Sequence, residues 1–289
     1  MRRRCFLVVL AASIAPTTFA QTPESIAPQP VEITSGDLHL KAFLWKPAGP
    51  GPFPAVVFNH GRSDSPRLHT AALKLTLEQA ARTLGPVFVK HGYVFLFPFR
   101  RGEGPSANQG NFIGDLLQRE EATRGADARK HLQVALMSTN HLQDARAALS
   151  YLKKLSYVDF HRIGIAGHSF GGQLTLLEAA GDSSVRAAVT FGAGAGSWDD
   201  SPELRDTLLA HVRQLPLPVM LNHAANDYSL APGKAIDDEL TRLSKPHVLK
   251  IYSPFGATPR HGHNFLYYDI RRWERDVFAF LDANVKDAE

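Results

Sequence analysis

The chain has 289 residues, of which 44% are hydrophobic, and this composition supports a single domain with a sizeable core. Three of the four units of the formal net charge of +4 arise at the amino terminus. Residues 1–20 contain three arginines and no acid, so 29 of the 32 basic side chains remain against 28 acids. No basic block is left to favour nucleic acid or an anionic membrane surface, and neither partner is expected.

An export signal is indicated at the amino terminus. Arg2–Arg4 precede an apolar run over Phe6–Ala12, and Thr18-Phe19-Ala20 has small residues where a signal peptidase cleaves. The run is too short for a permanent anchor, so residues 1–20 are predicted to be a removable signal peptide, with an uncleaved anchor as the alternative. The predicted location is periplasmic or secreted, without stable membrane insertion. The one cysteine, Cys5, lies in this segment, so the mature chain would contain no disulfide.

A Pro-rich tail over residues 21–30 precedes a single predicted domain, residues 31–289. Val31–Thr34 and Leu38–Trp45 favour an antiparallel strand pair about a Ser35-Gly36-Asp37 turn. Further apolar runs predict strands at Ala55–Phe58, Tyr93–Phe97, Ile163–Ala166, Val185–Phe191, Pro218–Asn222 and Val248–Tyr252. Helices are predicted at Glu78–His91 with a break at Gly85-Pro86, from an Asn140/Gln143 capping box through Leu152, and over Gly233–Leu243 and Ile270–Leu281.

Strands that alternate with helices predict an α/β fold, with a mostly parallel central sheet and helices on both faces. Ligands bind such sheets beyond the carboxyl ends of the strands. The charged segment between Asn111 and Met137 has a weak helical period. An insertion over the site, spanning residues 108–139, is preferred to a solvated surface as its interpretation.

The stretch Gly167-His168-Ser169-Phe170-Gly171 fits the pattern G-x-S-x-G and follows the predicted strand Ile163–Ala166. A helical pattern comes next, and this strand–turn–helix context is the one that a nucleophile elbow requires. The flanking glycines would let the backbone turn sharply and expose the Ser169 hydroxyl at the sheet edge. The backbone amide of Phe170 would then stabilise an oxyanion. The alternative is a glycine-rich turn in which Ser169 only caps the helix.

Two more residues at strand ends complete a hydrolase pattern. Asp227 follows the strand Pro218–Asn222 and His263 follows the strand Val248–Tyr252, so Ser, Asp and His occur in the chain order of a hydrolase triad. A serine hydroxyl needs an adjacent base, which a neutral His263 can supply, and Asp227 would hold the imidazole. Arg62, in the loop after the third strand, offers its backbone N–H as the second oxyanion donor.

Other residues compete for these roles. Asp199 and Asp200 are rivals of Asp227, which could itself be an ordinary loop aspartate. His60 and His168 are interpreted as supporting or packing residues rather than as catalysts.

His261 and His263 form an H-x-H pair that would suit zinc, but no third ligand at a convincing spacing accompanies them. Neither a metal nor another cofactor is therefore predicted. His263 is preferred to His261 as the base because Gly262 would let the backbone turn before it and Phe265 would anchor the loop after it. His261 is expected at the outer edge of the loop.

From Val31 onward the chain resembles an α/β-hydrolase, and within that superfamily it is most similar to dienelactone hydrolase-like proteins. The residues that carry the resemblance are Gly167-His168-Ser169-Phe170-Gly171-Gly172, Asn226-Asp227, Phe255-Gly256 and Gly262-His263-Asn264-Phe265. The loop Arg101-Gly102-Glu103-Gly104 resembles one in the prolyl oligopeptidase branch. Dienelactone hydrolases use a cysteine nucleophile, whereas this chain has Ser169, which argues against dienelactone itself as the substrate.

The expected function is an exported serine hydrolase that cleaves small-molecule carboxylic esters through an acyl-enzyme intermediate. The runner-up is an exported peptidase or amidase of the prolyl oligopeptidase type. Such peptidases resemble this core but usually carry a propeller or an additional β-rich domain, and no such segment is evident here, which favours the ester. A catalytically silent binding protein on the same fold is the alternative outside the enzymes. The sequence indicates no oligomeric state.

Overall fold

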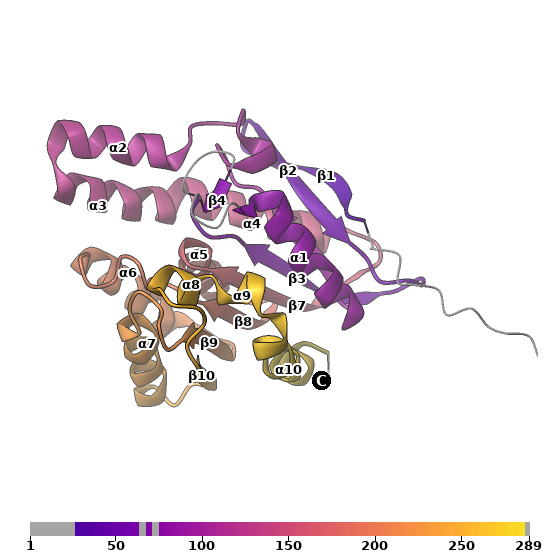
Figure 1. Ribbon diagram of the computed structural model, residues 1–289. Helices are drawn as coiled ribbons and strands as arrows, with labels where there is room; N and C mark the ends of the chain where they lie inside the picture. The colour runs from indigo at the N-terminus through magenta and orange to yellow at the C-terminus, as the bar shows by residue number, and fades with distance from the viewer. Residues whose placement is uncertain (1–26, 64–67, 71–74, 287–289) are drawn as a thin grey trace, which may run out of the picture.

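The computed structural model describes residues 27–63, 68–70 and 75–286 (Figure 1). The predicted signal peptide, residues 1–20, and most of the Pro-rich tail lie outside these ranges. Within them, no helix is both long enough and apolar enough to cross a membrane.

A central sheet of eight strands organises the fold, in the order β1-β2-β6-β3-β7-β8-β9-β10. Its strands are β1 Gln29–Ser35, β2 Leu38–Trp45, β3 Phe53–Asn59, β6 Val94–Pro98, β7 Val158–His168, β8 Val185–Phe191, β9 Val219–Ala224 and β10 His247–Tyr252. A separate short pair consists of β4 Leu68–Thr70 and β5 Leu75–Thr76. All the strands predicted from the sequence are present, with ends that differ by at most five residues.

The sheet contains antiparallel strand pairs only at the edge formed by β1 and β2. β1 pairs with β2 in antiparallel register, and Ser35 lies opposite Leu38 across a turn in which Gly36 has a φ of +59°. That left-handed conformation explains the glycine in the predicted turn. β2 is also antiparallel to β6, and every later neighbour in the sheet is parallel. The predicted α/β class with a mostly parallel sheet is confirmed.

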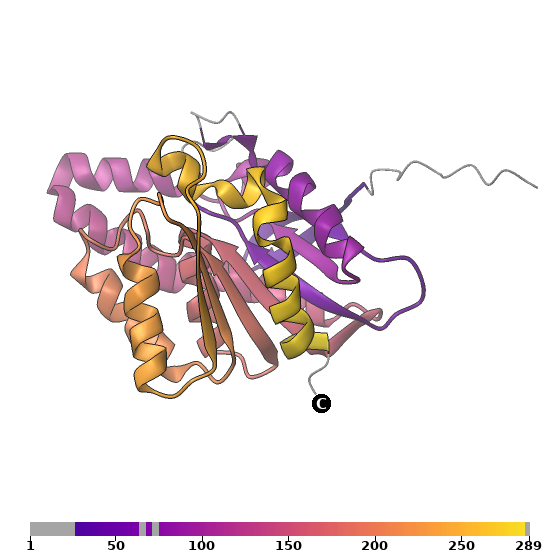
Figure 2. The ribbon, with the colours of Figure 1, turned by 60° about the horizontal axis from the view of Figure 1, so that its bottom comes forward.

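Helices cover both faces of the sheet (Figures 1 and 2). The helices are α1 Leu77–Lys90, α2 Ile113–Arg124, α3 Ala126–Leu136, α4 Leu142–Lys153, α5 Phe170–Ala180, α6 Pro202–Gln214, α7 Ala231–Arg242, α8 Pro259–His263, α9 Phe265–Tyr268 and α10 Ile270–Leu281. Apolar side chains of α4 to α7 form one core with the sheet, and those of α1 and α10 form a second core on the opposite face. In Figure 2 the yellow helix α10 crosses in front of the strands.

The break predicted at Gly85-Pro86 is wrong, because α1 continues through both residues to Lys90. Gly85 faces the indole of Trp45 on β2, and a Cβ at this position would lie 2.4 Å from that ring. The glycine is therefore required by close packing of the helix on the sheet. Pro86 also lies inside the helix, although it has no backbone N–H to donate.

The capping box predicted at Asn140 and Gln143 is also wrong. The chain is already helical when it reaches Asn140, because a π-helical turn, η2 (Met137–His141), joins α3 directly to α4. The amide of Leu142 bonds to the carbonyl of Met137 one turn earlier, so the first turn of α4 needs no side-chain cap. Gln143 instead points toward Arg101, which donates to it at 3.4 Å.

Three helical segments were not predicted as such from the sequence. The charged segment before η2 folds into two helices, α2 and α3, which run side by side away from the sheet (Figure 1). The stretch after Asp199 and Asp200 forms α6, and the expected loop around His263 forms the short helices α8 and α9.

Candidate active site

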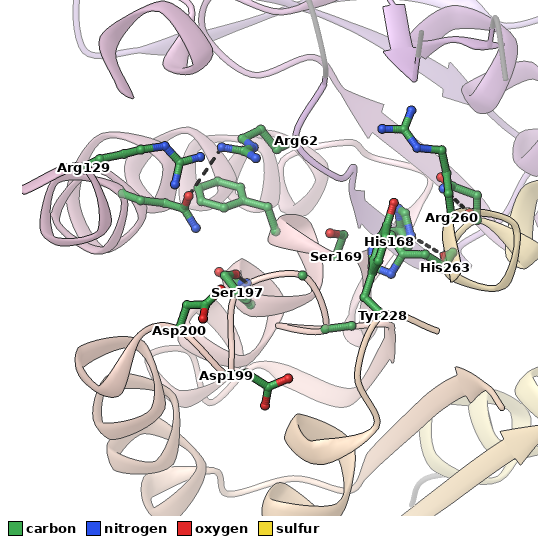
Figure 3. Close-up of a pocket in the computed structure, with 16 residues that line it drawn as sticks. Arg62, Arg129, His168, Ser169, Ser197, Asp199, Asp200, Tyr228, Arg260 and His263 are labelled. Carbon is green, nitrogen blue, oxygen red and sulfur yellow. Dashed lines mark hydrogen bonds between the residues drawn. The ribbon is translucent and has the colours of Figure 1, made fainter. Parts of the chain in front are cut away.

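The elbow at Ser169 joins β7 to α5 (Figure 3). Ser169 itself has a φ of +54° and a ψ of −118°, a strained conformation for a residue with a side chain. Its side chain makes no capping hydrogen bond to α5, contrary to the alternative interpretation as a helix cap. The backbone amide of Ser169 donates to the carbonyl of Phe191 at 2.8 Å, which ties the elbow to β8.

The two glycines of the motif serve a purpose different from the predicted one. Neither has a positive φ; both are needed because other chain segments approach closely. A Cβ on Gly167 would lie 2.4 Å from the carbonyl oxygen of Gly171, and one on Gly171 would lie 1.9 Å from that of Asn59. The glycines therefore allow α5 to pack on the ends of β7 and β3, and the strained turn is made by Ser169 alone.

Asp227 and His263 lie together at the same edge of the sheet. Asp227 follows β9, His263 ends α8, and the two are 8% and 7% exposed. The Nδ1–H of His263 donates to Oδ1 of Asp227 at 2.7 Å. Burial would raise the pKa of Asp227, but the charge of His263 and hydrogen bonds from His223 and His263 outweigh it, so the pKa lies well below its ordinary value. The carboxylate is therefore ionised and holds the imidazole at its Nδ1 edge.

His223 is a residue of this site that the sequence interpretation missed. It lies in β9 and is buried, and its Nδ1 donates to Oδ2 of Asp227 at 3.0 Å. The backbone amide of Tyr228 donates to the other oxygen, Oδ1, at 2.7 Å. Asp227 is thus held on both oxygens. The available signal was a histidine in an apolar strand four residues before a candidate aspartate, since a buried imidazole needs a polar partner.

The segment that carries His263 is supported from two sides. Gly262 packs against Asn226, where a Cβ would lie 2.5 Å from the backbone oxygen, so close packing rather than a turn explains this glycine. His168, from the elbow, donates through Nε2 to the carbonyl of His263 at 2.8 Å. His168 is therefore placed as a supporting residue of the His263 backbone.

The two histidines of the H-x-H pair point to different partners. His261 is half-exposed and bonds through Nδ1 to the hydroxyl of Thr258 at 2.8 Å, whereas His263 bonds to Asp227. Within the described part of the chain, no group of three or more His, Cys, Asp or Glu side chains is arranged to hold a metal ion.

A cavity of about 430 Å³ opens in front of Ser169. The lining residues are Arg62, Arg129, Gln133, His168, Ser169, Phe170, Gln173, Ala195, Gly196, Ser197, Asp199, Asp200, Tyr228, Arg260, His263 and Asn264. In Figure 3, Ser169 lies between a wall that carries Arg62 and Arg129 and a wall that carries His168 and His263. Asp199 and Asp200 are exposed on a third side, and the described partner of His263 is Asp227 rather than either of them.

The two predicted oxyanion donors border this cavity. Phe170 is the first residue of α5, and Arg62 follows β3. The side chain of Arg62 turns toward α3, where its Nη1 donates to Gln133 at 3.4 Å. His60, in the same loop, is fully buried and stacks on Phe97, which places it away from the cavity.

Helix α3 supplies one wall of the cavity through Arg129 and Gln133. Arg129 pairs with Glu121 of α2 at 3.1 Å, and this pair joins the two helices of the hairpin. His131 of α3 bonds to Glu203 of α6 at 3.0 Å, so the hairpin also contacts the body of the domain. The segment predicted as an insertion therefore contributes side chains to the site.

Solved structures with a similar fold are hydrolases of several kinds. The acylaminoacyl peptidase of Pyrococcus horikoshii superposes with a TM-score of 0.62 at 18% identity, covering 91% of this chain and 42% of the peptidase. Est1E of Butyrivibrio proteoclasticus, solved with ferulic acid, gives 0.61 at 17% identity over 88% of this chain and all of Est1E. Dienelactone hydrolase of Anabaena variabilis gives 0.58 at 17% identity over 90% of this chain and 99% of that enzyme.

One curated relative is the quorum-quenching protein AidA of Acinetobacter baumannii, 27% identical over 164 residues. The match covers 57% of this chain and 43% of AidA. This chain therefore spans less than half the length of AidA, and it also spans only 42% of the peptidase. The profile of the dienelactone hydrolase family matches residues 40–269, which include the elbow, Asp227 and His263. The chain therefore belongs to the dienelactone hydrolase family and has the α/β-hydrolase fold.

Proposed function

We propose that this protein cleaves carboxylic esters of small molecules, with Ser169 as nucleophile, His263 as general base and Asp227 as the residue that orients it. The observation that carries the proposal is the 2.7 Å hydrogen bond from His263 to the buried Asp227, beside a cavity that Ser169 also lines. Membership in a hydrolase family supports the reaction class. The strained φ of Ser169 further supports its role, because strain of this kind concentrates at functional sites.

Acylation begins when Oγ of Ser169 attacks the ester carbonyl carbon while its proton passes to Nε2 of His263. The Nδ1–H bond to Asp227 selects the tautomer in which Nε2 is the free base, and the carboxylate stabilises the imidazolium that forms. The backbone amides of Phe170 and Arg62 would receive the oxyanion. The tetrahedral intermediate collapses as its bond to the alcohol oxygen breaks, and the alcohol leaves with the proton of His263.

Deacylation repeats the sequence with water in place of serine. His263 takes a proton from the water, whose oxygen attacks the acyl carbon, and the second intermediate collapses by returning that proton to Oγ of Ser169. The products are a carboxylic acid and an alcohol, and the enzyme returns to its starting state.

The cavity volume of about 430 Å³ supports a small substrate, since ligand pockets of this kind hold drug-sized molecules or smaller. The α2–α3 hairpin would act as the outer wall of this pocket through Arg129 and Gln133.

We further propose that the protein acts after export, on the strength of the arginine, apolar and small-residue pattern of residues 1–20. Recovery of exported protein that begins at Gln21 would support this step, and recovery only of chains that begin at Met1 would contradict it.

The test compares p-nitrophenyl acetate and butyrate with aminoacyl p-nitroanilides. Ser169→Ala is expected to lower ester turnover by on the order of 10⁴-fold or more, with the fold retained. Ser197→Ala, in the same cavity, is the matched control and should cost less than tenfold. Preferential hydrolysis of the anilides would favour a peptidase or amidase. Failure to hydrolyse either class, together with failure of Ser169 to react with a fluorophosphonate, would favour a binding protein.

A further inference from the structure

A buried ion pair lies directly behind the loop that carries Arg62. Arg100 and Glu103, in the segment after β6, are 1% and 0% exposed, and neither lines the cavity. Nη2 of Arg100 donates to Oε2 of Glu103 at 3.0 Å. Burial lowers the pKa of Arg100 and raises that of Glu103, which shows that this position penalises both charges. A buried ion pair of this kind contributes little net stability, since replacing both partners by apolar residues of similar volume often leaves folding stability unchanged or raises it.

The hydrogen bonds of the pair converge on the backbone of the loop over residues 60–63. Arg100 donates through Nη1 to the carbonyl of His60 at 2.5 Å and through Nη2 to that of Gly61 at 3.0 Å. Glu103 accepts from the backbone amide of Ser63 at 3.1 Å. Three backbone groups of this four-residue loop are therefore fixed by two charged side chains.

His60 strengthens the same arrangement. Its Nε2 accepts from the backbone amide of Arg100 at 3.2 Å, so the ring proton resides on Nδ1. Nδ1 then donates to the Gly61 carbonyl at 2.7 Å. The Gly61 carbonyl thus accepts from both a guanidinium and an imidazole, which fixes the plane of the Gly61–Arg62 peptide.

The orientation of that peptide determines the direction of the Arg62 amide. The peptide is trans, and in a trans peptide the C=O and the following N–H point in opposite directions. With the Gly61 carbonyl directed at Arg100, the Arg62 N–H is directed away from the buried pair. Arg62 also borders the cavity that contains Ser169. A cation on the carbonyl polarises the peptide and makes its N–H a stronger donor.

We propose that Arg100, balanced by Glu103, is a positioning residue that holds the Arg62 backbone N–H as the second oxyanion donor. The inference rests on the proposed function of the Ser169 site. The guanidinium also lies over the ring of Phe170, 5.4 Å from its centroid, so one side chain contacts Phe170 and the peptide group that carries the Arg62 N–H. Arg100 acts through the backbone and touches no substrate.

The neighbouring Arg101 provides a matched control. It forms a second largely buried ion pair, with Asp144, through bonds of 2.8 Å from Nε and 2.6 Å from Nη2. Asp144 in turn accepts from Ser35 of β1 at 2.7 Å, so this pair ties the sheet edge to α4. Arg101→Lys should alter stability without a selective effect on the transition state.

The experiment measures kcat and KM for p-nitrophenyl acetate with the wild type, Arg100→Lys and Arg101→Lys. Sites are counted by stoichiometric fluorophosphonate labelling, so that kcat refers to folded enzyme only. Loss of one oxyanion donor costs roughly 10²–10³ in rate, and we expect a kcat loss of that order for Arg100→Lys with KM changed less than threefold. Affinity for a trifluoromethyl ketone, which adds to Ser169 as a charged hemiketal, should fall by a similar factor. Arg101→Lys should leave kcat and the affinity for the trifluoromethyl ketone within threefold of wild type.

Glu103→Gln keeps the test decisive if Arg100→Lys does not fold. Ser63 and Arg100 donate to different oxygens of Glu103, Oε1 and Oε2, and in glutamine one of these positions becomes an NH₂ group that cannot accept, so one of the two bonds is lost. We expect about a tenfold loss of kcat with KM unchanged, the cost of about one hydrogen bond to a charged group. Unchanged kcat and hemiketal affinity in the folded variants would overturn the inference. A wild type that neither hydrolyses the ester nor labels at Ser169 would overturn the proposed function first.

Discussion

Glu178 is a buried acid at the back of the elbow helix, and its ionisation should make the fold less stable as pH rises. It lies in α5 with 0% exposure, and its Oε2 accepts from Nδ2 of Asn59 at 2.9 Å. Its other oxygen has no hydrogen-bond partner among the described residues. Burial raises the pKa of Glu178 from 4.5 to about 7. Asn59 ends β3 just before the loop of Arg62, so the acid lies beneath the site.

The sign of the effect follows from proton binding in the two states. Between pH 4.5 and about 7 the unfolded chain has released this proton while the folded chain keeps it, so stability falls with rising pH. Above pH 7 both states are ionised and the full cost is present. The gap between a pKa of 4.5 and one of about 7, at about 1.4 kcal/mol per unit, amounts to about 3 kcal/mol.

Glu178→Gln removes the ionisation but keeps the size of the side chain and an acceptor for Asn59. We expect the variant to gain about 3 kcal/mol in unfolding free energy relative to wild type between pH 4.5 and pH 8, measured by urea unfolding at each pH. The comparison between the two proteins cancels the titration of all other groups. If the difference between them stayed constant across this range, Glu178 would not be a buried, neutralised acid.

Three further predictions concern the histidines and the close helix packing. His263→Ala should lower kcat on a p-nitrophenyl ester by about 10³ or more and His261→Ala by less than tenfold; a larger loss at His261 would place the base two residues earlier. His223→Phe should lower kcat about 10- to 100-fold, since a hydrogen bond to a charged group contributes about 1.5–3 kcal/mol, and an unchanged kcat would remove His223 from the site. Gly85→Ala should lower the unfolding free energy by about 1–3 kcal/mol, because its Cβ would lie 2.4 Å from the Trp45 ring; chemical denaturation measures this, and a stabilised variant would contradict it.

The sheet was predictable because its strands are short apolar runs bounded by turn residues. Ile163–Ala166 lies within β7, and Val185–Phe191 forms β8, as predicted. The elbow was predictable for the same reason: its motif sits between a strand and a helix, and both elements are found at those positions. Local sequence patterns are sufficient to predict an element where its apolar residues follow the spacing of the secondary structure that it adopts.

Tertiary contacts explain where the sequence interpretation was wrong. Gly85 resembles a helix break until the indole of Trp45, which lies on another element, is placed against it. Asn140 resembles a cap because the π-helical turn that makes a cap unnecessary has no marker in the residues before it. A contact between distant segments decides the case of Gly85, and a continuous helical backbone decides that of Asn140; residue spacing along the chain reveals neither.

The supporting residues of the site were missed for a similar reason. Ser169, Asp227 and His263 each follow a predicted strand, and that position in the sequence singles them out. His223 lies within a strand, and Arg100 belongs to the charged loop after β6. Their roles depend on partners elsewhere in the fold, the carboxylate of Asp227 and the backbone of Gly61. Burial of a charged or titratable group is the property that identifies them, and it is known only from the structure.

The identity of the nucleophile is tested most directly by mapping a fluorophosphonate adduct. Wild-type protein is labelled to completion, digested and analysed by mass spectrometry, and ester hydrolysis is followed in parallel. We predict one adduct per chain, on the peptide that contains Ser169, with activity lost in proportion to labelling and no adduct in Ser169→Ala. An adduct on another residue, or full ester hydrolysis by protein labelled at Ser169, would contradict the assignment of Ser169 as the nucleophile.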